Sequence, residues 1–281
     1  MIEFLKAGNK NYTKKDLIET LEKLEIQKGD TICVHTELFN FGIPLIPKKD
    51  HLSIYIEAFL EVIGKNGTLI MPTFTYSFCK NQIYDKFHSK CKVGILNEFF
   101  RLWGGVKRTN DPIFSFAIKG KNQELFLKDT KSCFGQNCVY DMLSKTNGKI
   151  ILFGSKINGY TFTHFIEEKA QVPYRYFKEF KGKIALENGI NKNKKINYYV
   201  RDLNMDSDLD VYKQIQILQQ DNNFKIENFA NSSIVNINAN RYLSATLRAL
   251  EKNAYCLLTD LKKLKENHAH PHLQLSRKKP C

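Results

Sequence analysis

Apolar residues in the first half of the chain recur with two different spacings, which predict helices and buried strands in alternation. Residues 13–25 (TKKDLIETLEKLE) carry leucines at helical spacing, and Thr13 with Asp16 forms a capping-box pattern at the start of that helix. The run TICVH at 31–35 is apolar and β-branched between turn residues, which is typical of a strand buried on both faces. The same order then repeats, so we expect parallel strands covered by helices.

Later segments extend this alternation and then depart from it. The sequence predicts helices over 51–63, 93–102 and 138–145, strands over 68–74, 115–120 and 148–155, and a further helix that begins near Phe162. After Pro173, segments of alternating apolar and polar residues separated by turns are typical of antiparallel strands. Residues 241–262 again have helical periodicity.

Together these patterns predict an α/β fold, layered α/β/α, with a largely parallel central sheet and a smaller C-terminal α+β region with antiparallel strands. We expect an α/β core over residues 1–175, an α+β region over 176–265 packed on that core, and a flexible basic tail over 266–281.

Composition narrows the class of protein. Of 281 residues, 42% are hydrophobic and 26% charged, which are globular values, and no stretch approaches the roughly 20 apolar residues that a membrane span needs. The N-terminus has no signal-peptide pattern, so we expect a cytoplasmic protein. Seven cysteines without CxxC spacing predict neither a disulfide framework nor a zinc site.

Positive charge favours polyanionic ligands. The chain has 43 Lys and Arg against 29 Asp and Glu, a formal charge of +14, which suits nucleic acid, an anionic membrane, or phosphate-bearing cofactors and substrates. Lysine beside asparagine and isoleucine, as in NKNKKIN at 191–197, equally fits a bias of composition.

The other motifs in the sequence give little support to a metal site or to nucleic-acid binding. The acidic residues at 206, 208 and 210 resemble the start of a calcium loop, but Val211 stands where glycine is required. The histidines at 268, 270 and 272 lie in the tail without paired ligands, so we expect no metal site. The chain has no GxxxxGK[ST], no GxGxxG and no nucleic-acid-binding signature.

One pair of residues is suited to acid–base chemistry. In THFIEE, His164 and Glu167 lie three apart on the expected helix, so both project from one face and the carboxylate can fix the imidazole tautomer. This is the arrangement of a general base. An isolated HxxE is a weak signal, because most such pairs are surface hydrogen bonds.

The segments around His164 and Glu167 strengthen the prediction that this pair is catalytic. Six segments occur in a recognisable order: VHTELFNFG at 34–42, GTLIMPTFTYSF at 67–78, VGILNEFFR at 93–101, VKRTNDPIFSFAIKG at 106–120, GKIILFGSKINGYTFTHFIEE at 148–168 and VPYR at 172–175. The chain thereby resembles the aminoglycoside 3-N-acetyltransferase family of antibiotic acetyltransferases, which also includes acyltransferases acting on nucleotide-linked amino sugars. The resemblance covers about residues 10–185.

The resemblance implies an acyl-coenzyme A-dependent N-acyltransferase with His164 as general base and Glu167 as its orienting partner. It places the coenzyme in the 1–175 core and the acceptor partly in the 176–265 region. It assigns coenzyme contacts to Thr36, Glu37, Leu38, Thr73, Phe74, Thr75, Arg108, Thr109, Ser115 and Phe116, and substrate contacts to Tyr76, Thr161, Tyr174 and Arg175. His35 ends the strand before these residues, and we expect it either to contact the coenzyme or to be a structural residue. Glu37 stands where the family usually has Ser, and Asp111 where His is common.

The acceptor is harder to identify. Aminoglycosides are polycations, whereas this chain has a large positive excess, so we expect a nucleotide-linked amino sugar and a role in surface polysaccharide biosynthesis. The alternative is aminoglycoside 3-N-acetylation that confers antibiotic resistance, and a non-catalytic nucleic-acid-binding protein is a second alternative. For either enzyme we expect acetyl-CoA or another acyl-CoA as co-substrate, no metal, and no nucleic-acid or membrane partner. The oligomeric state stays open, a homodimer included.

Overall fold

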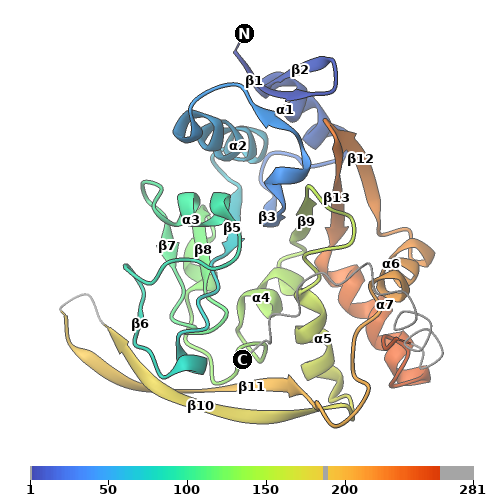
Figure 1. The fold of residues 1–281 in the computed structure, drawn as a ribbon. Coiled ribbons are helices and arrows are strands. Elements are labelled where there is room, and N and C mark those ends of the chain that lie inside the picture. The colour runs from blue at the N-terminus through green and yellow to red at the C-terminus, as the bar shows by residue number, and fades with distance from the viewer. Residues whose placement is uncertain (1, 186–188, 260–281) are drawn as a thin grey trace, which may run out of the picture.

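The computed structural model describes residues 2–185 and 189–259 and is built on a mixed seven-stranded sheet (Figure 1). In spatial order its strands are β12 (Lys225–Phe229), β13 (Ser232–Asn238), β9 (Lys149–Phe153), β3 (Thr31–Thr36), β5 (Thr68–Pro72), β8 (Phe116–Gly120) and β7 (Lys107–Arg108). The α/β prediction is confirmed, but only β9, β3 and β5 are mutually parallel. The strands on either side pair antiparallel.

The antiparallel neighbour of β5 has a direct consequence for the site. Because antiparallel strands need no crossover, the long connection at residues 73–115 leaves and re-enters the sheet at the carboxyl end of β5. That end is where β3 and β9 also finish. Loops from three strands therefore gather at one edge of the sheet.

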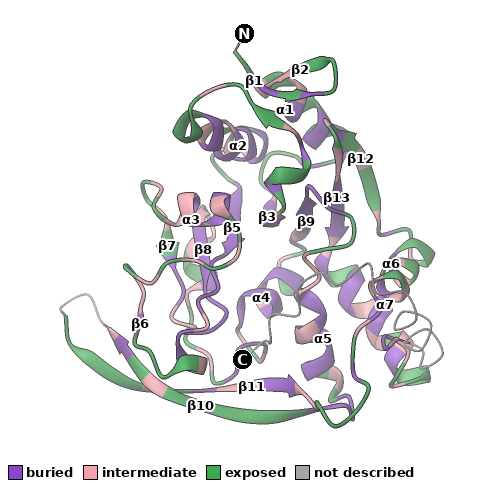
Figure 2. Cartoon of the chain, viewed as in Figure 1, coloured by how far each residue is buried: buried purple, intermediate pink, exposed green. Residues whose placement is uncertain are grey.

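Helices cover both faces of the sheet. They are α1 (Lys14–Lys23), α2 (Lys48–Ile63), α3 (Ile95–Arg101), α4 (Val139–Lys145), α5 (Phe162–Ala170), α6 (Val211–Gln220) and α7 (Ala239–Lys252). Alternate side chains of β3 enter opposite cores: Ile32 and Val34 pack with α1, α2 and α3, whereas Cys33 packs with α4, α5 and α7. The purple interior of Figure 2 follows these two cores.

Predicted helix ends agree with the structure at the N-terminus of the chain and differ near the C-terminus. Thr13 and Asp16 form the expected capping box of α1. The helix predicted over 241–262 ends at Lys252, because Asn253 leaves the helical conformation and a turn follows. Three short 3-10 turns complete the helical elements of the described chain: η1 (Leu38–Asn40), η2 (Phe78–Lys80) and η3 (Gln123–Phe126).

Two smaller sheets flank the main one. A sheet of β2 (Lys10–Thr13), β1 (Glu3–Ala7) and β4 (Ile43–Pro44) lies at the N-terminal end, and the sequence pattern did not predict it. The antiparallel strands predicted after Pro173 are β10 (Arg175–Ala185) and β11 (Asn191–Arg201), with β6 (Tyr84–Asp85) beside β10. This long hairpin passes below α5 in Figure 1.

The C-terminal third of the chain rejoins the main sheet. Strand β13 pairs with β9, and Asn236 on β13 donates a hydrogen bond of 2.7 Å to the backbone carbonyl of Leu24 just after α1. The proposed division near residue 175 remains a prediction, and the tail at 266–281 lies outside the described residues. Within residues 2–185 and 189–259, no helix combines the length and apolar character that crossing a membrane requires.

Candidate functional site

The predicted base and its partner meet on α5. His164 Nδ1 lies 2.9 Å from Glu167 Oε2, one helical turn apart. Glu167 is fully buried, whereas 24% of the His164 side chain is exposed. Helix α5 is the next element after β9 and is joined to its carboxyl end by the loop at residues 154–161, so the pair follows the edge of the sheet where the loops gather.

A third charged group joins the pair from another element. Arg175, the first residue of β10, places Nε 2.9 Å from Glu167 Oε2 and Nη2 3.0 Å from His164 Nδ1. Its Nη1 donates to the backbone carbonyl of Tyr199 on β11. Arg175 is buried. The structure thus brings this residue, predicted to contact substrate, against the proposed catalytic pair.

The charges of these three groups set their protonation. Burial alone would raise the pKa of Glu167, but the hydrogen bond with His164 and the charge of Arg175 outweigh it, and the pKa falls below its ordinary value. Burial first, and the charge of Arg175 second, lower the pKa of His164 despite the opposing effect of Glu167. His164 is therefore neutral near pH 7, as a general base must be.

A cavity of about 470 Å³ opens at the carboxyl ends of β3, β5 and β9. Its lining includes seven of the predicted binding residues: His35, Thr36, Glu37, Leu38, Phe74, Tyr76 and Thr161. His164 is not among the lining residues, but Thr161, which precedes α5, is. Hydroxyl and amide groups alternate with apolar side chains around this cavity, a surface that fits an extended chain with both amides and methylenes.

His35 has a structural environment. It is buried beneath the cavity, its Nε2 lies 3.1 Å from the Tyr140 hydroxyl, and burial lowers its pKa to about 4. Gly159 approaches it so closely that a Cβ there would lie 2.8 Å from the His35 Cβ. This contact, and the positive φ of 97°, require glycine at the turn before α5.

Another part of the cavity wall, at Thr36, depends on the buried side-chain amide of Asn97. Thr36 Oγ1 donates to Asn97 Oδ1 at 2.6 Å, and Asn97 Nδ2 donates to the Pro72 carbonyl at 2.7 Å. Gly94 has a φ of 88°, and a Cβ there would lie 2.9 Å from Thr36 Oγ1. The carboxyl ends of β3 and β5 are thereby tied to α3, and no pattern in the sequence indicated that Asn97 would contribute.

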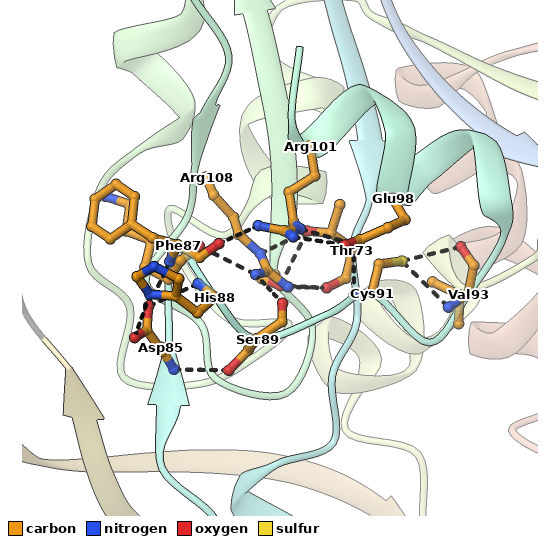
Figure 3. A network of polar contacts seen from close by, with 12 residues as sticks. Thr73, Asp85, Phe87, His88, Ser89, Cys91, Val93, Glu98, Arg101 and Arg108 are labelled. Carbon is orange, nitrogen blue, oxygen red and sulfur yellow. Dashed lines mark hydrogen bonds and ion pairs between the residues drawn. The ribbon is translucent and has the colours of Figure 1, made fainter. Parts of the chain in front are cut away.

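Arg108 is predicted to contact the coenzyme, and that role remains a prediction; its hydrogen bonds in the structure go to groups of the protein. It donates to Thr73 Oγ1 at 3.1 Å, the Thr73 carbonyl at 2.7 Å, Ser115 Oγ at 3.1 Å and the Ser89 carbonyl at 2.6 Å. Figure 3 shows the bonds from Arg108 to Thr73 and Ser89 beside the Arg101–Glu98 ion pair. Arg108 thus joins β5 and β8 to the 85–93 loop.

The remaining predicted contacts lie inside the protein. Thr73, Thr75, Thr109, Ser115, Phe116 and Tyr174 are all buried. Thr75 Oγ1 donates to the Pro112 carbonyl at 2.8 Å, and Thr109 Oγ1 accepts from the Phe116 amide at 3.0 Å. Their roles toward a ligand remain predictions.

Asp111, at the position where the family often has His, supports a turn. Its carboxylate accepts from the backbone amides of Ile113 and Phe114, each at 2.8 Å, just before β8. Burial raises the pKa of this carboxyl group, and the two amide bonds oppose that change.

Aromatic rings connect the cavity with the catalytic pair. Tyr76 at the cavity wall packs edge-on against Phe114, Phe114 contacts Phe134, and Phe134 lies 5.6 Å from the His164 ring between centroids. Sequence analysis missed Phe134, because it lies in a loop without periodicity. Among the described residues, no group of three or more His, Cys, Asp or Glu side chains could hold a metal ion.

Comparison with known proteins identifies a family. The family model described as aminoglycoside 3-N-acetyltransferase matches residues 34–251. An aminoglycoside N(3)-acetyltransferase III from Salmonella is 22% identical over 58% of this chain and 62% of its own length. The YokD protein of Bacillus subtilis, named as aminoglycoside N(3′)-acetyltransferase-like, is 24% identical over 58% of this chain. The chain thus spans less than two thirds of the length of each of these relatives: 62% of the Salmonella protein and 66% of YokD.

Solved structures share the fold. Aminoglycoside acetyltransferase AAC(3)-IVa in complex with gentamicin superposes with a TM-score of 0.76 at 21% identity, over 92% of this chain and 95% of that one. The AAC-IIIb binary complex with CoASH gives 0.74 at 20% identity, over 89% and 98%.

These findings correct the preference for a nucleotide-linked amino sugar. The family match and its relatives support the alternative, an aminoglycoside 3-N-acetyltransferase. Net charge was misleading because much of it lies away from the cavity, as with the exposed lysines 178, 181 and 183 of β10. The cavity lining contains one basic residue, Lys92, and one acidic residue, Glu37. With 218 consecutive positions, residues 34–251, covered by one family model, the chain belongs to the aminoglycoside 3-N-acetyltransferase family.

Proposed function

We propose that this protein is an acetyl-CoA-dependent N-acetyltransferase whose acceptor is an amino group of an aminoglycoside. The observation that carries the proposal is His164: a partly exposed imidazole held by a buried carboxylate, on the helix that follows Thr161, which lines the cavity at the carboxyl edge of the sheet. Relatives named for this activity support the choice of acceptor.

In the proposed reaction His164 Nε2 removes a proton from the acceptor amine, because an amine attacks a thioester only when it is neutral. For this task Nδ1 must carry the other ring proton and donate it to Glu167, which stabilises the imidazolium as it forms. The new C–N bond replaces the C–S bond, and the proton held by His164 leaves with the thiol. The amine acts directly as the nucleophile, so the chain need not supply one.

The cavity at the carboxyl edge is the proposed site for the pantetheine arm. Thr36, Ser155 and Asn158 offer polar groups for its amides, and Leu38 and Phe74 offer apolar surface for its methylenes. We infer that the thioester reaches His164 past Tyr76 and Thr161, because both line the cavity and Thr161 immediately precedes α5. The cytoplasmic location expected from the sequence remains a prediction.

The test is thiol release from acetyl-CoA in the presence of kanamycin- and gentamicin-type aminoglycosides, with glucosamine as a simple amino sugar. We expect turnover with at least one aminoglycoside and a loss of about 10²–10⁴-fold in kcat for His164→Ala. Absence of turnover with every aminoglycoside would refute the acceptor class. Wild-type turnover by the His164 variant would refute the mechanism.

A further inference from the structure

Arg175 occupies an unusual position for a residue expected to bind substrate. It is 7% exposed and reaches into the catalytic pair from β10, 11 positions after His164. Its described contacts include Glu167 Oε2, His164 Nδ1, the Tyr199 carbonyl and the side chain of Tyr198. A guanidinium so enclosed contacts the base and the carboxylate, and leaves little surface for an acceptor.

Two neighbouring side chains, Glu167 and Arg175, can each form a hydrogen bond with His164 Nδ1. Glu167 Oε2, at 2.9 Å, can only accept when ionised, and Arg175 Nη2, at 3.0 Å, can only donate. A protonated Nδ1 therefore donates to Glu167, and an unprotonated Nδ1 accepts from Arg175. Each neutral tautomer finds a partner. The doubly protonated ring also donates from Nδ1 to Glu167, but it carries a positive charge beside the fixed positive charge of Arg175, so Arg175 disfavours it.

The other groups that face His164 cannot take over the effect of Arg175 on its protonation. Glu167, from α5, favours the imidazolium. Arg201 on β11 is a second cation that acts on His164, and its effect is weaker than that of Arg175. Arg201 pairs with Asp208. Tyr198 on the same strand is half-buried and hydrogen-bonds to Arg175, and burial raises its pKa to about 12. From the loop before α4, Phe134 contributes an apolar ring.

We propose that Arg175 is a positioning residue that keeps His164 neutral and holds the ionised Glu167 against its Nδ1 side. This inference rests on the proposed function only in that His164 is the catalytic base. Two consequences separate it from substrate binding. Replacing Arg175 should change the pH at which His164 gains its second proton, and it should leave the KM for the aminoglycoside nearly unchanged.

The experiment follows the His164 ring nitrogens by ¹⁵N NMR during a pH titration, without any substrate. In the wild type we expect a midpoint below the ordinary value of about 6.5. Arg175→Gln should raise the midpoint by about one pH unit, and Arg175→Lys, which keeps the charge, should change it less. The matched control is Arg201→Gln, which removes a charge at the paired position of the same hairpin and should shift it by under about 0.3 unit.

Steady-state assays of the same variants complete the test. The acidic limb of kcat/KM should move upward in Arg175→Gln by the same amount as the NMR midpoint, with the aminoglycoside KM within about twofold of wild type. A wild-type midpoint at or above about 6.5 overturns the proposal even if the Gln variant does not fold. An unchanged midpoint in a folded Arg175→Gln protein overturns it too. Because the titration needs no acceptor, an inactive protein with the expected midpoints refutes only the proposed function.

Discussion

Two buried arginines, Arg108 and Arg175, were both expected to contact ligands, and the structure uses them in opposite ways. Arg108 donates to neutral hydroxyl and carbonyl oxygens in the network of Figure 3 and lies 5.2 Å from the centroid of the Tyr84 ring. Arg175 is paired with a buried carboxylate and an imidazole. Burial lowers the pKa of Arg108, whereas for Arg175 the charge of Glu167 outweighs burial and raises the pKa.

The difference shows what a buried cation does in each place. Where it meets only neutral acceptors, its hydrogen bonds organise backbone, here the 85–93 loop that leads into the cavity wall at Lys92 and Val93. Where it meets a carboxylate beside a base, it also sets protonation. Two predictions test this distinction, and two more, on His35 and Thr36, test buried groups that contact neither arginine; they follow from the largest expected effect to the smallest.

The largest effect should come from removing the carboxylate beside Arg175. Glu167→Ala leaves a buried guanidinium without its counter-charge, so the free energy of unfolding should fall by about 3–5 kcal/mol. The kcat should fall by at least about 10²-fold, because His164 loses its orienting partner. Denaturant unfolding and thiol release measure the two effects. The double variant with Arg175→Met should recover stability without recovering turnover, and a single variant as stable as wild type would contradict the ion pair.

Arg108→Met should cost about 2–4 kcal/mol of unfolding free energy, because several buried oxygens lose their donor at once. The kcat of the folded protein should stay within about threefold of wild type, since Arg108 contacts neither His164 nor Glu167. Arg248→Met is the matched control, because its ion pair with Asp221 is exposed and should contribute under about 1 kcal/mol. A large loss of kcat with unchanged stability would mean that Arg108 acts on the ligand.

Acid should destabilise the protein through His35 independently of both arginines. Its pKa is about 4 in the folded protein and about 6.5 when unfolded, so the unfolded chain binds the extra proton between these values. Stability is therefore full above about pH 6.5 and falls as the pH drops toward 4, by about 2 kcal/mol at pH 5. Unfolding curves of wild type and His35→Gln at pH 7.5 and pH 5 give the difference. Equal pH dependence in the two proteins would exclude His35 as the cause.

The smallest effect belongs to the cavity wall. Thr36→Val removes the hydroxyl that donates to Asn97 and should lower the unfolding free energy by about 1 kcal/mol. Thr36→Ser retains the hydroxyl and should lose less. Thermal unfolding measures both, and we expect a parallel rise of the acetyl-CoA KM by a small factor in the valine variant alone. Equal losses in the two variants would point to the missing methyl group instead.

Local sequence signals predicted much of the fold. The capping box of Thr13 and Asp16, the buried run of β3 and the spacing of His164 and Glu167 all depend on neighbours within a few positions. The N-terminal sheet could not be predicted in this way. Strand β4 has two residues and finds its partner β1 almost 40 positions earlier, so periodicity has too little length to reveal it.

The site was predictable in part for the same reason. A resemblance could align Arg108 and Arg175 with ligand-contacting blocks, but their roles depend on which groups the fold places beside them. Thr73 and Ser89 come to Arg108 from two separate segments, and Glu167 comes to Arg175 from α5. Phe134 had no local signal at all, because its place beside His164 follows from the packing of a loop against α5.

The bond from Asn236 to the Leu24 carbonyl joins residues 212 positions apart. During synthesis α1 emerges early, yet the carbonyl group that follows it acquires this partner only after β13 has been made. One edge of β9 likewise lacks its partner strand until β13 has been synthesised. The nascent chain must therefore keep an incomplete sheet from pairing elsewhere until β13 has left the ribosome, and contacts of such long sequence separation make folding slow.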